Sequence, residues 1–143
     1  MVLERKGPSL PQALASAAGK TPAPKKAAGD AAEAQALRWL QSRGLQPVAR
    51  NYRVARGPSA RGGEVDLIVR ERDGTLVFVE VRARADARHG GAAASVSAAK
   101  QRRIIYAAQH YLMRLAAPPP CRFDVIAIEG DRVEWIKGAF GAA

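Results

Sequence analysis

Three carboxylates and an arginine stand inside two aliphatic stretches near the middle of the chain. Residues 63–70 read GEVDLIVR and residues 76–83 read LVFVEVRA, so Glu64, Asp66 and Glu80 interrupt runs of Val, Leu, Ile and Phe. Runs of this kind are typical of strands with a buried face, where an unpaired charge is costly. Acids at these positions therefore indicate either a strand face that is open to water or a site that binds a cation.

The two stretches predict a hairpin whose register follows from their aliphatic residues. Side chains alternate across a strand, so each strand has one aliphatic face. The two faces consist of Val65, Leu67 and Val69 and of Val77, Val79 and Val81. Both must lie on the same side of the sheet, because a slip of one residue would expose one of them. A three-residue loop, Arg72-Asp73-Gly74, satisfies this condition, pairs Val65 with Val81, and has the glycine that such a loop prefers.

The same register places Asp66 opposite Glu80 and Glu64 opposite Arg82. Opposed Cβ atoms are about 4.5–5.5 Å apart, and like charges at that distance are destabilising. Two opposed carboxylates need a shared proton, an arginine or a metal ion. A hard divalent ion such as Mg²⁺ or Mn²⁺ takes carboxylate oxygens and water as ligands. The hairpin therefore predicts a metal site built from Asp66, Glu80 and Glu64.

A solvated strand face is the alternative interpretation of these acids. In that case the three carboxylates face water at an edge of the sheet, and Arg70 and Arg82 neutralise them. Against this, Ile68 and Phe78 lie on the same strand faces as the acids, which indicates that these faces are covered. Acids among apolar neighbours are more typical of functional sites. Periodicity alone leaves both interpretations open.

The surrounding sequence predicts the elements that must position the hairpin. Residues 30–43 have the pattern of a helix, with Asp30 as N-cap and Glu33 three residues later in a capping box. The other predicted elements are strands at 46–54, 64–70, 76–82, 121–128 and 132–137, loops at 56–63 and 83–95, and a helix at 96–116 that ends before Pro118. The order α-β-β-β-α-β-β predicts a three-layer α/β domain with a central mixed sheet flanked by helices.

Charge and composition limit the kind of partner and the number of domains. The chain has 143 residues, with 23 Lys and Arg against 13 Asp and Glu, and a net charge of +10. Residues 1–28 are rich in Ala, Pro and Lys and predict a disordered basic tail, which leaves residues 29–143 as a single domain. The tail holds five basic residues and one acid, so a net charge of +6 remains in the domain. Such an excess favours nucleic acid as the partner.

The pattern of apolar residues predicts no secretion signal and no membrane segment. No apolar run approaches the roughly 18 residues of a membrane-spanning helix. The chain has one cysteine, Cys121, which excludes an internal disulfide. We therefore expect a cytoplasmic protein in a reducing compartment.

The motifs of the hairpin resemble those of a known nuclease family. The pattern GEVDLI followed by VFVEVR is similar to the PD-(D/E)xK nuclease core, with Asp66 as the first acid and residues 80–82 as the (D/E)-x-K element. Further matching segments are residues 29–33, 50–52, 122–124 and 135–137. Together, residues 29–140 resemble the YraN family of endonuclease-like proteins, which is related to archaeal Holliday-junction resolvases.

This resemblance implies a restriction-endonuclease-like fold and a metal-dependent endonuclease that hydrolyses phosphodiester bonds in branched or single-stranded DNA. It also implies that Asp66 and Glu80 hold Mg²⁺ or Mn²⁺, and that Glu33 contributes to the metal site from the first helix. Since resolvase-like enzymes often work as dimers, it further suggests a homodimer. From the residues alone, the capping box is the better explanation of Glu33.

Arg82 departs from the family motif, which has lysine at this position. Arginine keeps its proton and cannot act as a general base, but it can bind a phosphate oxygen or stabilise developing negative charge. Alternatively, Arg82 only neutralises Glu64 or Glu80 in a site without catalysis. The chain would then be an inactive nuclease-fold module that binds DNA or RNA, or a protein that binds another partner.

Basic side chains outside the hairpin predict a track for a nucleic-acid backbone. Lys100 and Arg103 are three residues apart, so they share one face of the second predicted helix. Together with basic residues of the loop at 56–63, they can follow a row of phosphates. The predicted nucleic-acid-binding residues are Arg56, Arg61, Lys100, Gln101 and Arg103.

Overall fold

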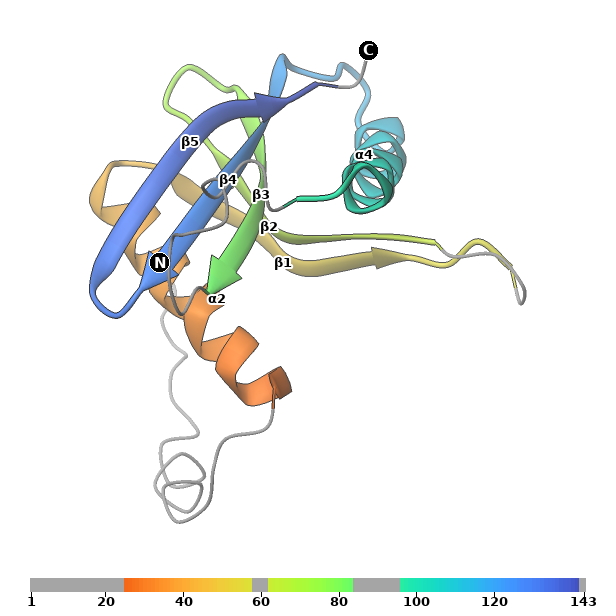
Figure 1. Cartoon of the computed structure of the whole chain (residues 1–143). Coiled ribbons are helices and arrows are strands. Elements are labelled where there is room, and N and C mark those ends of the chain that lie inside the picture. The colour runs from red at the N-terminus through yellow and green to blue at the C-terminus, as the bar shows by residue number, and fades with distance from the viewer. Residues whose placement is uncertain (1–24, 58–61, 84–95, 142–143) are drawn as a thin grey trace, which may run out of the picture. The chain divides into compact units, whose positions relative to one another are not determined.

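The computed structural model of the chain describes residues 25–57, 62–83 and 96–141. Its strands form one five-stranded sheet in the order β1-β2-β3-β4-β5 (Figure 1). The elements are α2 (Lys25–Ser42), β1 (Gln46–Val54), β2 (Gly63–Arg70), β3 (Leu76–Ala83), α4 (Ala98–Met113), β4 (Cys121–Glu129) and β5 (Arg132–Phe140). Strands β3 and β4 run parallel, joined by the crossover that contains α4, and the other neighbours run antiparallel. The predicted element order and mixed sheet are confirmed.

Two apolar clusters, one on each face of the sheet, make up the core. The α4 cluster contains Val65, Ile68, Phe78, Ile104, Ala107, Ala108, Phe123 and Val125. The α2 cluster contains Ala32, Ala36, Leu40, Leu67, Val69, Val77, Val79 and Ile126. Each helix thus covers one face, which gives the three layers of helix, sheet and helix that the sequence predicts.

The first helix is longer than predicted. It begins at Lys25, so Asp30 lies inside the helix and the predicted N-cap at this residue is wrong. Residues 25–28 are lysines and alanines, which favour a helix, and Gly29 lowers helix stability by only about 1 kcal/mol relative to alanine. The helix therefore continues through the expected boundary. Of the predicted basic tail, residues 1–24 lie outside the described part of the chain.

The hairpin of β2 and β3 has the register predicted from its aliphatic faces. Backbone pairs run from Leu67–Val79 to Arg70–Leu76. The loop between them places Gly74 at φ +96°, and the Gly74 N–H donates to the carbonyl of Glu71 at 2.9 Å. This left-handed conformation favours glycine, because any residue with a Cβ atom strains its own backbone at a positive φ.

The two strands separate at the level of the acids, which corrects the predicted pairing. The backbone ladder ends at Leu67 and Val79. The expected pairs beyond it, Asp66–Glu80, Glu64–Arg82 and Val65–Val81, are absent from the ladder of the described strands. Instead, Oδ2 of Asp66 accepts a hydrogen bond from the Val81 N–H at 2.9 Å. A carboxylate thus takes the place of a strand carbonyl where the sheet opens.

The alternation of faces in β2 also changes at this point. Leu67 and Val69 pack in the α2 cluster, but Val65 packs in the α4 cluster, so the predicted common face is wrong for Val65. In β1, Tyr52 pairs with Val65, and the preceding residue, Asn51, has a left-handed φ of +50°. This conformation turns the two-stranded ribbon, which continues side by side past α4 (Figure 1).

The second helix, α4, is shorter at both ends than predicted. Ser97 caps its N-terminus, since Oγ accepts the N–H of Lys100 at 3.1 Å. The helix ends at Met113, before the prolines that were expected to stop it. Ile104 and Ala108 face the core, as the apolar spacing predicts. No described helix combines the length and the apolar character that crossing a membrane requires.

Candidate functional site

Asp66 and Glu80 lie at the opening between β2 and β3, and both are nearly buried. Asp66 is 9% exposed and Glu80 is 3% exposed. Asp66 lies in β2, where the β1–β2 ribbon turns. Its carboxylate accepts a hydrogen bond from the Val81 N–H, which holds it beside β3. This hydrogen bond holds Asp66 close to Glu80 although the two strands no longer pair at this level.

Glu80 has two cationic neighbours, but neither makes a short contact. Arg82 Nη1 lies 3.4 Å from Oε2, and Lys100 Nζ lies 3.8 Å from Oε1. Among the described residues, Oε1 of Glu80 has no hydrogen-bond donor. Charge-assisted hydrogen bonds to a carboxylate are normally about 2.7–2.9 Å long. The positive charges therefore compensate Glu80 only in part.

This environment changes the acidity of Glu80. Burial, followed by the negative charge of Asp66, raises the pKa of Glu80 from 4.5 to about 8. Lys100 and Arg82 act in the opposite direction and lower this pKa. Near neutral pH the site thus favours either a proton on Glu80 or an additional cation.

Lys100 connects this pair to a third acid. It stands in the first turn of α4, and its Nζ lies 3.7 Å from Glu64 Oε2 and 3.8 Å from Glu80 Oε1. Its side chain is 19% exposed. The sequence predicts Lys100 as a phosphate-binding residue of the helix face, but it contains no signal that brings this lysine beside the acids. That proximity results from the packing of α4 on β2.

The donor set is suited to a hard divalent ion. Mg²⁺ is often held by one or two carboxylates, with water and substrate phosphate completing its octahedron, and Asp66 and Glu80 provide such a pair. No three Asp, Glu, His or Cys side chains in the described part of the chain meet as a ligand group. Glu64 is linked to Glu80 through Lys100. Glu33 is nearly buried in α2, on the helix that covers the other face. Metal binding by Glu64 and Glu33 stays a prediction.

The predicted nucleic-acid-binding residues have different surroundings. Gln101 Nε2 donates to the carbonyl of Val96 at 3.1 Å, so its amide contributes to the start of α4. The guanidinium of Arg56 lies over the ring of Tyr106, 5.1 Å from its centroid. Arg61 lies outside the described residues. Nothing in these contacts tests whether the residues bind nucleic acid.

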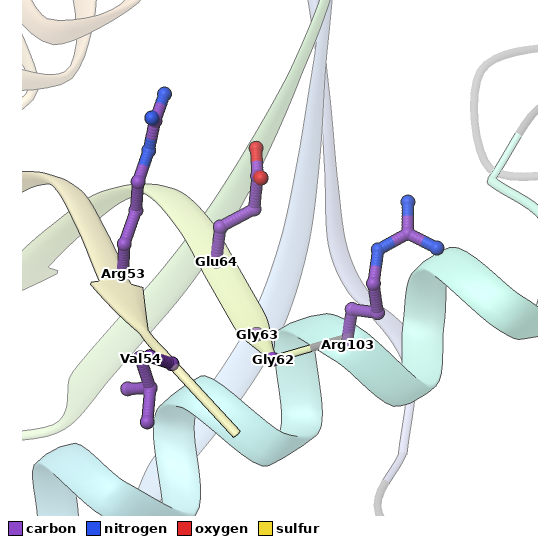
Figure 2. A pocket seen from close by; sticks show the side chains of 7 residues that line it. Arg53, Val54, Gly62, Gly63, Glu64 and Arg103 are labelled. Atoms are coloured by element: carbon purple, nitrogen blue, oxygen red, sulfur yellow. The ribbon is translucent and has the colours of Figure 1, made fainter. Parts of the chain in front are cut away.

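A pocket of about 370 Å³ lies next to the acids, where the β1–β2 ribbon passes α4. It is lined by Arg53, Val54, Ala55, Gly62, Gly63, Glu64 and Arg103. Figure 2 shows Arg53, Glu64 and Arg103, from three different elements, pointing to the same side of the pocket. The sequence predicts Arg103 as a functional residue but not Arg53, whose only sequence signal is its charge.

Comparison with known proteins identifies the family. The model of the uncharacterised protein family UPF0102 matches residues 32–128. The chain belongs to UPF0102. This is the YraN family of restriction-endonuclease-like proteins, so the resemblance drawn from the motifs is confirmed.

Curated UPF0102 relatives match about four fifths of the chain. The UPF0102 protein of Methylibium petroleiphilum is 64% identical over 118 residues, which cover 82% of this chain and 97% of the relative. Those of Acidovorax sp. and Verminephrobacter eiseniae are 61% and 63% identical and cover 82% and 80% of this chain and 87% and 78% of their own. Their names state the family and no reaction. The function must therefore be inferred from the site itself.

Proposed function

We propose that this UPF0102 protein is a metal-dependent endonuclease that hydrolyses phosphodiester bonds in branched or single-stranded DNA. The observation that carries the proposal is the buried pair of Asp66 and Glu80, in which the pKa of Glu80 is raised to about 8. Strong perturbation of a carboxylate by burial and by a second carboxylate is typical of catalytic sites. The restriction-endonuclease-like fold agrees with this assignment by analogy.

In this proposal, Asp66 and Glu80 hold Mg²⁺ or Mn²⁺. The ion supplies a Lewis acid for the phosphate and lowers the pKa of water, so that hydrolysis can proceed near neutral pH. Glu80 would hold the ion in its ionised form and would give up its proton on binding, since an adjacent divalent cation would stabilise the carboxylate. Burial raises the pKa of Glu80 and so disfavours its charged form in the metal-free site. A bound divalent ion would offset this cost, because it would stabilise the charged form.

Lys100 and Arg82 have different tasks in the proposed reaction. Arg82 is about one-third exposed and keeps its proton, so it binds a non-bridging phosphate oxygen and stabilises the negative charge that develops there. Lys100 approaches the acids from α4 and supplies an ammonium group with three donors. We therefore assign to Lys100 the part that the motif reserves for a lysine at position 82.

The decisive experiment is cleavage of labelled four-way-junction and single-stranded DNA with Mn²⁺ or Mg²⁺ and with EDTA. We expect metal-dependent cleavage by the wild type and a loss of at least about 100-fold in Asp66→Asn and Glu80→Gln. Glu134→Gln, which removes an exposed acid on β5, is the matched control and should cleave normally. Undiminished cleavage by both site variants would show that the assigned site is wrong.

Metal binding is measured separately from cleavage. Mn²⁺ should raise the Tm of the wild type, because a ligand that binds the folded state stabilises it, but should not raise the Tm of Glu80→Gln. A wild type that binds Mn²⁺ and DNA and does not cleave either substrate would favour the inactive binding module.

Separate substitutions of Lys100 and Arg82 distinguish the roles of these two residues. Lys100→Met should lower kcat with little change in DNA affinity, if Lys100 acts on the reaction. Arg82→Lys should weaken DNA binding if the guanidinium holds a phosphate, and it should increase cleavage if arginine limits the chemistry. Unchanged binding and cleavage in Arg82→Lys would restrict Arg82 to neutralising Glu80.

A further inference from the structure

The pocket beside the acids is formed by the close contact of a strand ribbon with a helix. In the ribbon, Arg53 of β1 is the direct partner of Glu64 of β2, so their Cβ atoms are about 4.5–5.5 Å apart on one face. Arg103 reaches the same pocket from α4 (Figure 2). Three charged side chains from three elements thus meet at one hollow.

Two glycines allow the backbones to come this close. A Cβ atom on Gly63 would overlap the Arg103 carbonyl and lie 2.7 Å from the Ala107 nitrogen. A Cβ atom on Gly62 would overlap the carbonyl of Val54. A larger residue at position 63 would therefore push the ribbon away from α4, and a larger residue at position 62 would push it away from the end of β1, so either change would alter the pocket. The hollow depends on specific residues and is not a loose gap in packing.

The charge of the pocket is suited to an anion. Its lining contains two guanidinium groups and one carboxylate, Glu64. Lys100, whose Nζ lies 3.7 Å from Glu64, compensates this carboxylate in part. Arg53 is exposed and Arg103 is half-buried, so both can reach a ligand. Guanidinium groups bind phosphate oxygens with two parallel hydrogen bonds, which gives a phosphate an advantage over simpler anions.

We propose that this pocket binds a backbone phosphate of a nucleic-acid strand, next to the phosphate that faces Asp66 and Glu80. Arg53 and Arg103 contact the phosphate oxygens, and the Glu64–Lys100 pair connects the pocket to the acids. The strand lies over the surface where the ribbon meets α4, and the ring of Tyr106 under Arg56 lies farther along the same helix. The assignment of a strand rather than a free nucleotide rests on the proposed function.

The test is DNA affinity of the full chain in EDTA, where metal-dependent cleavage does not interfere. Arg53→Gln and Arg103→Gln should each weaken binding of a fluorescent single strand and reduce the slope of log K against log salt by about 1. The lysine variants Arg53→Lys and Arg103→Lys should keep the slope. Glu64→Gln should tighten binding, because it removes the negative charge. Arg132→Gln, which changes an arginine that is 81% exposed, is the control.

Several outcomes separate this proposal from the proposed function. If Arg53→Gln and Arg103→Gln bind with the affinity and slope of Arg132→Gln, the pocket does not hold a strand phosphate, whether or not the wild type cleaves DNA. If they lose affinity and the wild type never cleaves, the pocket stands and the nuclease function fails. A third outcome would also overturn the strand proposal: millimolar adenosine 5′-monophosphate binds the pocket, while Arg53→Gln and Arg103→Gln keep the wild-type salt slope for strand binding. That result would assign the pocket to free nucleotides.

Discussion

Neighbouring strands β3 and β4 each bury one carboxylate, and the surroundings of these two acids are opposite in character. Val79 pairs with Asp124, and Glu80 pairs with Val125, so the acids point to opposite faces of the sheet. Glu80 is 3% exposed and Asp124 is 0% exposed. Burial is therefore nearly the same, and the difference between the two regions lies in their partners.

Asp124 has donors for both of its oxygens. Oδ1 accepts from Arg122 Nε at 2.9 Å and from the Gly138 N–H at 2.9 Å. Oδ2 accepts from Arg122 Nη2 at 3.0 Å and from Trp135 Nε1 at 2.8 Å. Hydrogen bonds from Arg122 to Asp124 raise the pKa of that guanidinium above its ordinary value. This acid connects β4 to the irregular part of β5 and leaves no capacity for a ligand.

Glu80 is the contrasting case. Its contacts to Arg82 and Lys100 are 3.4 and 3.8 Å long, and the neighbouring carboxylate of Asp66 opposes its charge. The comparison teaches that burial of an acid does not identify a functional site. Incomplete compensation is the stronger indication, because an unfavourable buried group calls for an explanation such as binding or chemistry.

The largest effect is expected from removal of the compensated acid. Asp124→Ala leaves Trp135 without its acceptor and Arg122 with Glu71 as its remaining carboxylate partner, and breaking a buried pair of this kind costs about 3–5 kcal/mol of unfolding free energy. Denaturant unfolding measures this loss. The control is Glu129→Ala, whose ion pair with Arg132 is on the surface, and which should change stability by less than about 1 kcal/mol. A small loss of unfolding free energy in Asp124→Ala would mean that Asp124 is no better compensated than Glu80.

A smaller loss is expected when one donor of the same cluster is deleted. Trp135→Phe keeps an aromatic ring against Trp39 but loses the indole N–H that donates to Asp124 at 2.8 Å. A hydrogen bond to a charged group contributes about 1.5–3 kcal/mol, so the free energy of unfolding should fall by about 2 kcal/mol. In the double variant Asp124→Ala/Trp135→Phe the two losses should not add, since both remove the same hydrogen bond. Additive losses would mean that the indole acts through packing alone.

An effect of the opposite sign is expected at the other acid, Glu80. The folded state holds the Glu80 proton up to about pH 8, whereas the unfolded chain releases it near pH 4.5, so metal-free stability falls as the pH rises between these values. Glu80→Gln cannot lose this proton. It should therefore be more stable than the wild type at pH 8.5 without metal, and the gain should vanish near pH 4.5.

Chemical unfolding at several pH values in EDTA checks this sign, with Glu134→Gln as the reference for loss of an exposed acid. If Glu80→Gln is less stable than the wild type at pH 8.5, as Asp124→Ala is expected to be, both carboxylates serve to stabilise the fold. The distinction between the two strands would then be lost.

Most of the architecture follows from local patterns in the sequence. The alternation of aliphatic residues and the glycine of the loop determine that β2 and β3 pair with Leu67 opposite Val79, because one face must be buried and the turn needs a left-handed residue. Apolar spacing identifies α4, and the family motifs identify Asp66 and Glu80. The first helix boundary was less predictable, since lysine and alanine fit both a tail and a helix.

The relations between distant segments were decided by the tertiary structure alone. Local alternation cannot reveal that Asn51 turns the ribbon, that the strands separate at Asp66, or that α4 brings Lys100 to Glu80. Nor does charge distinguish Asp124 from Glu80, because compensation depends on donors that come from other strands. Sequence by itself thus determined the elements and the identity of the acids. Packing determined which acid is fully paired and which remains available for a ligand, since that depends on distances across the sheet.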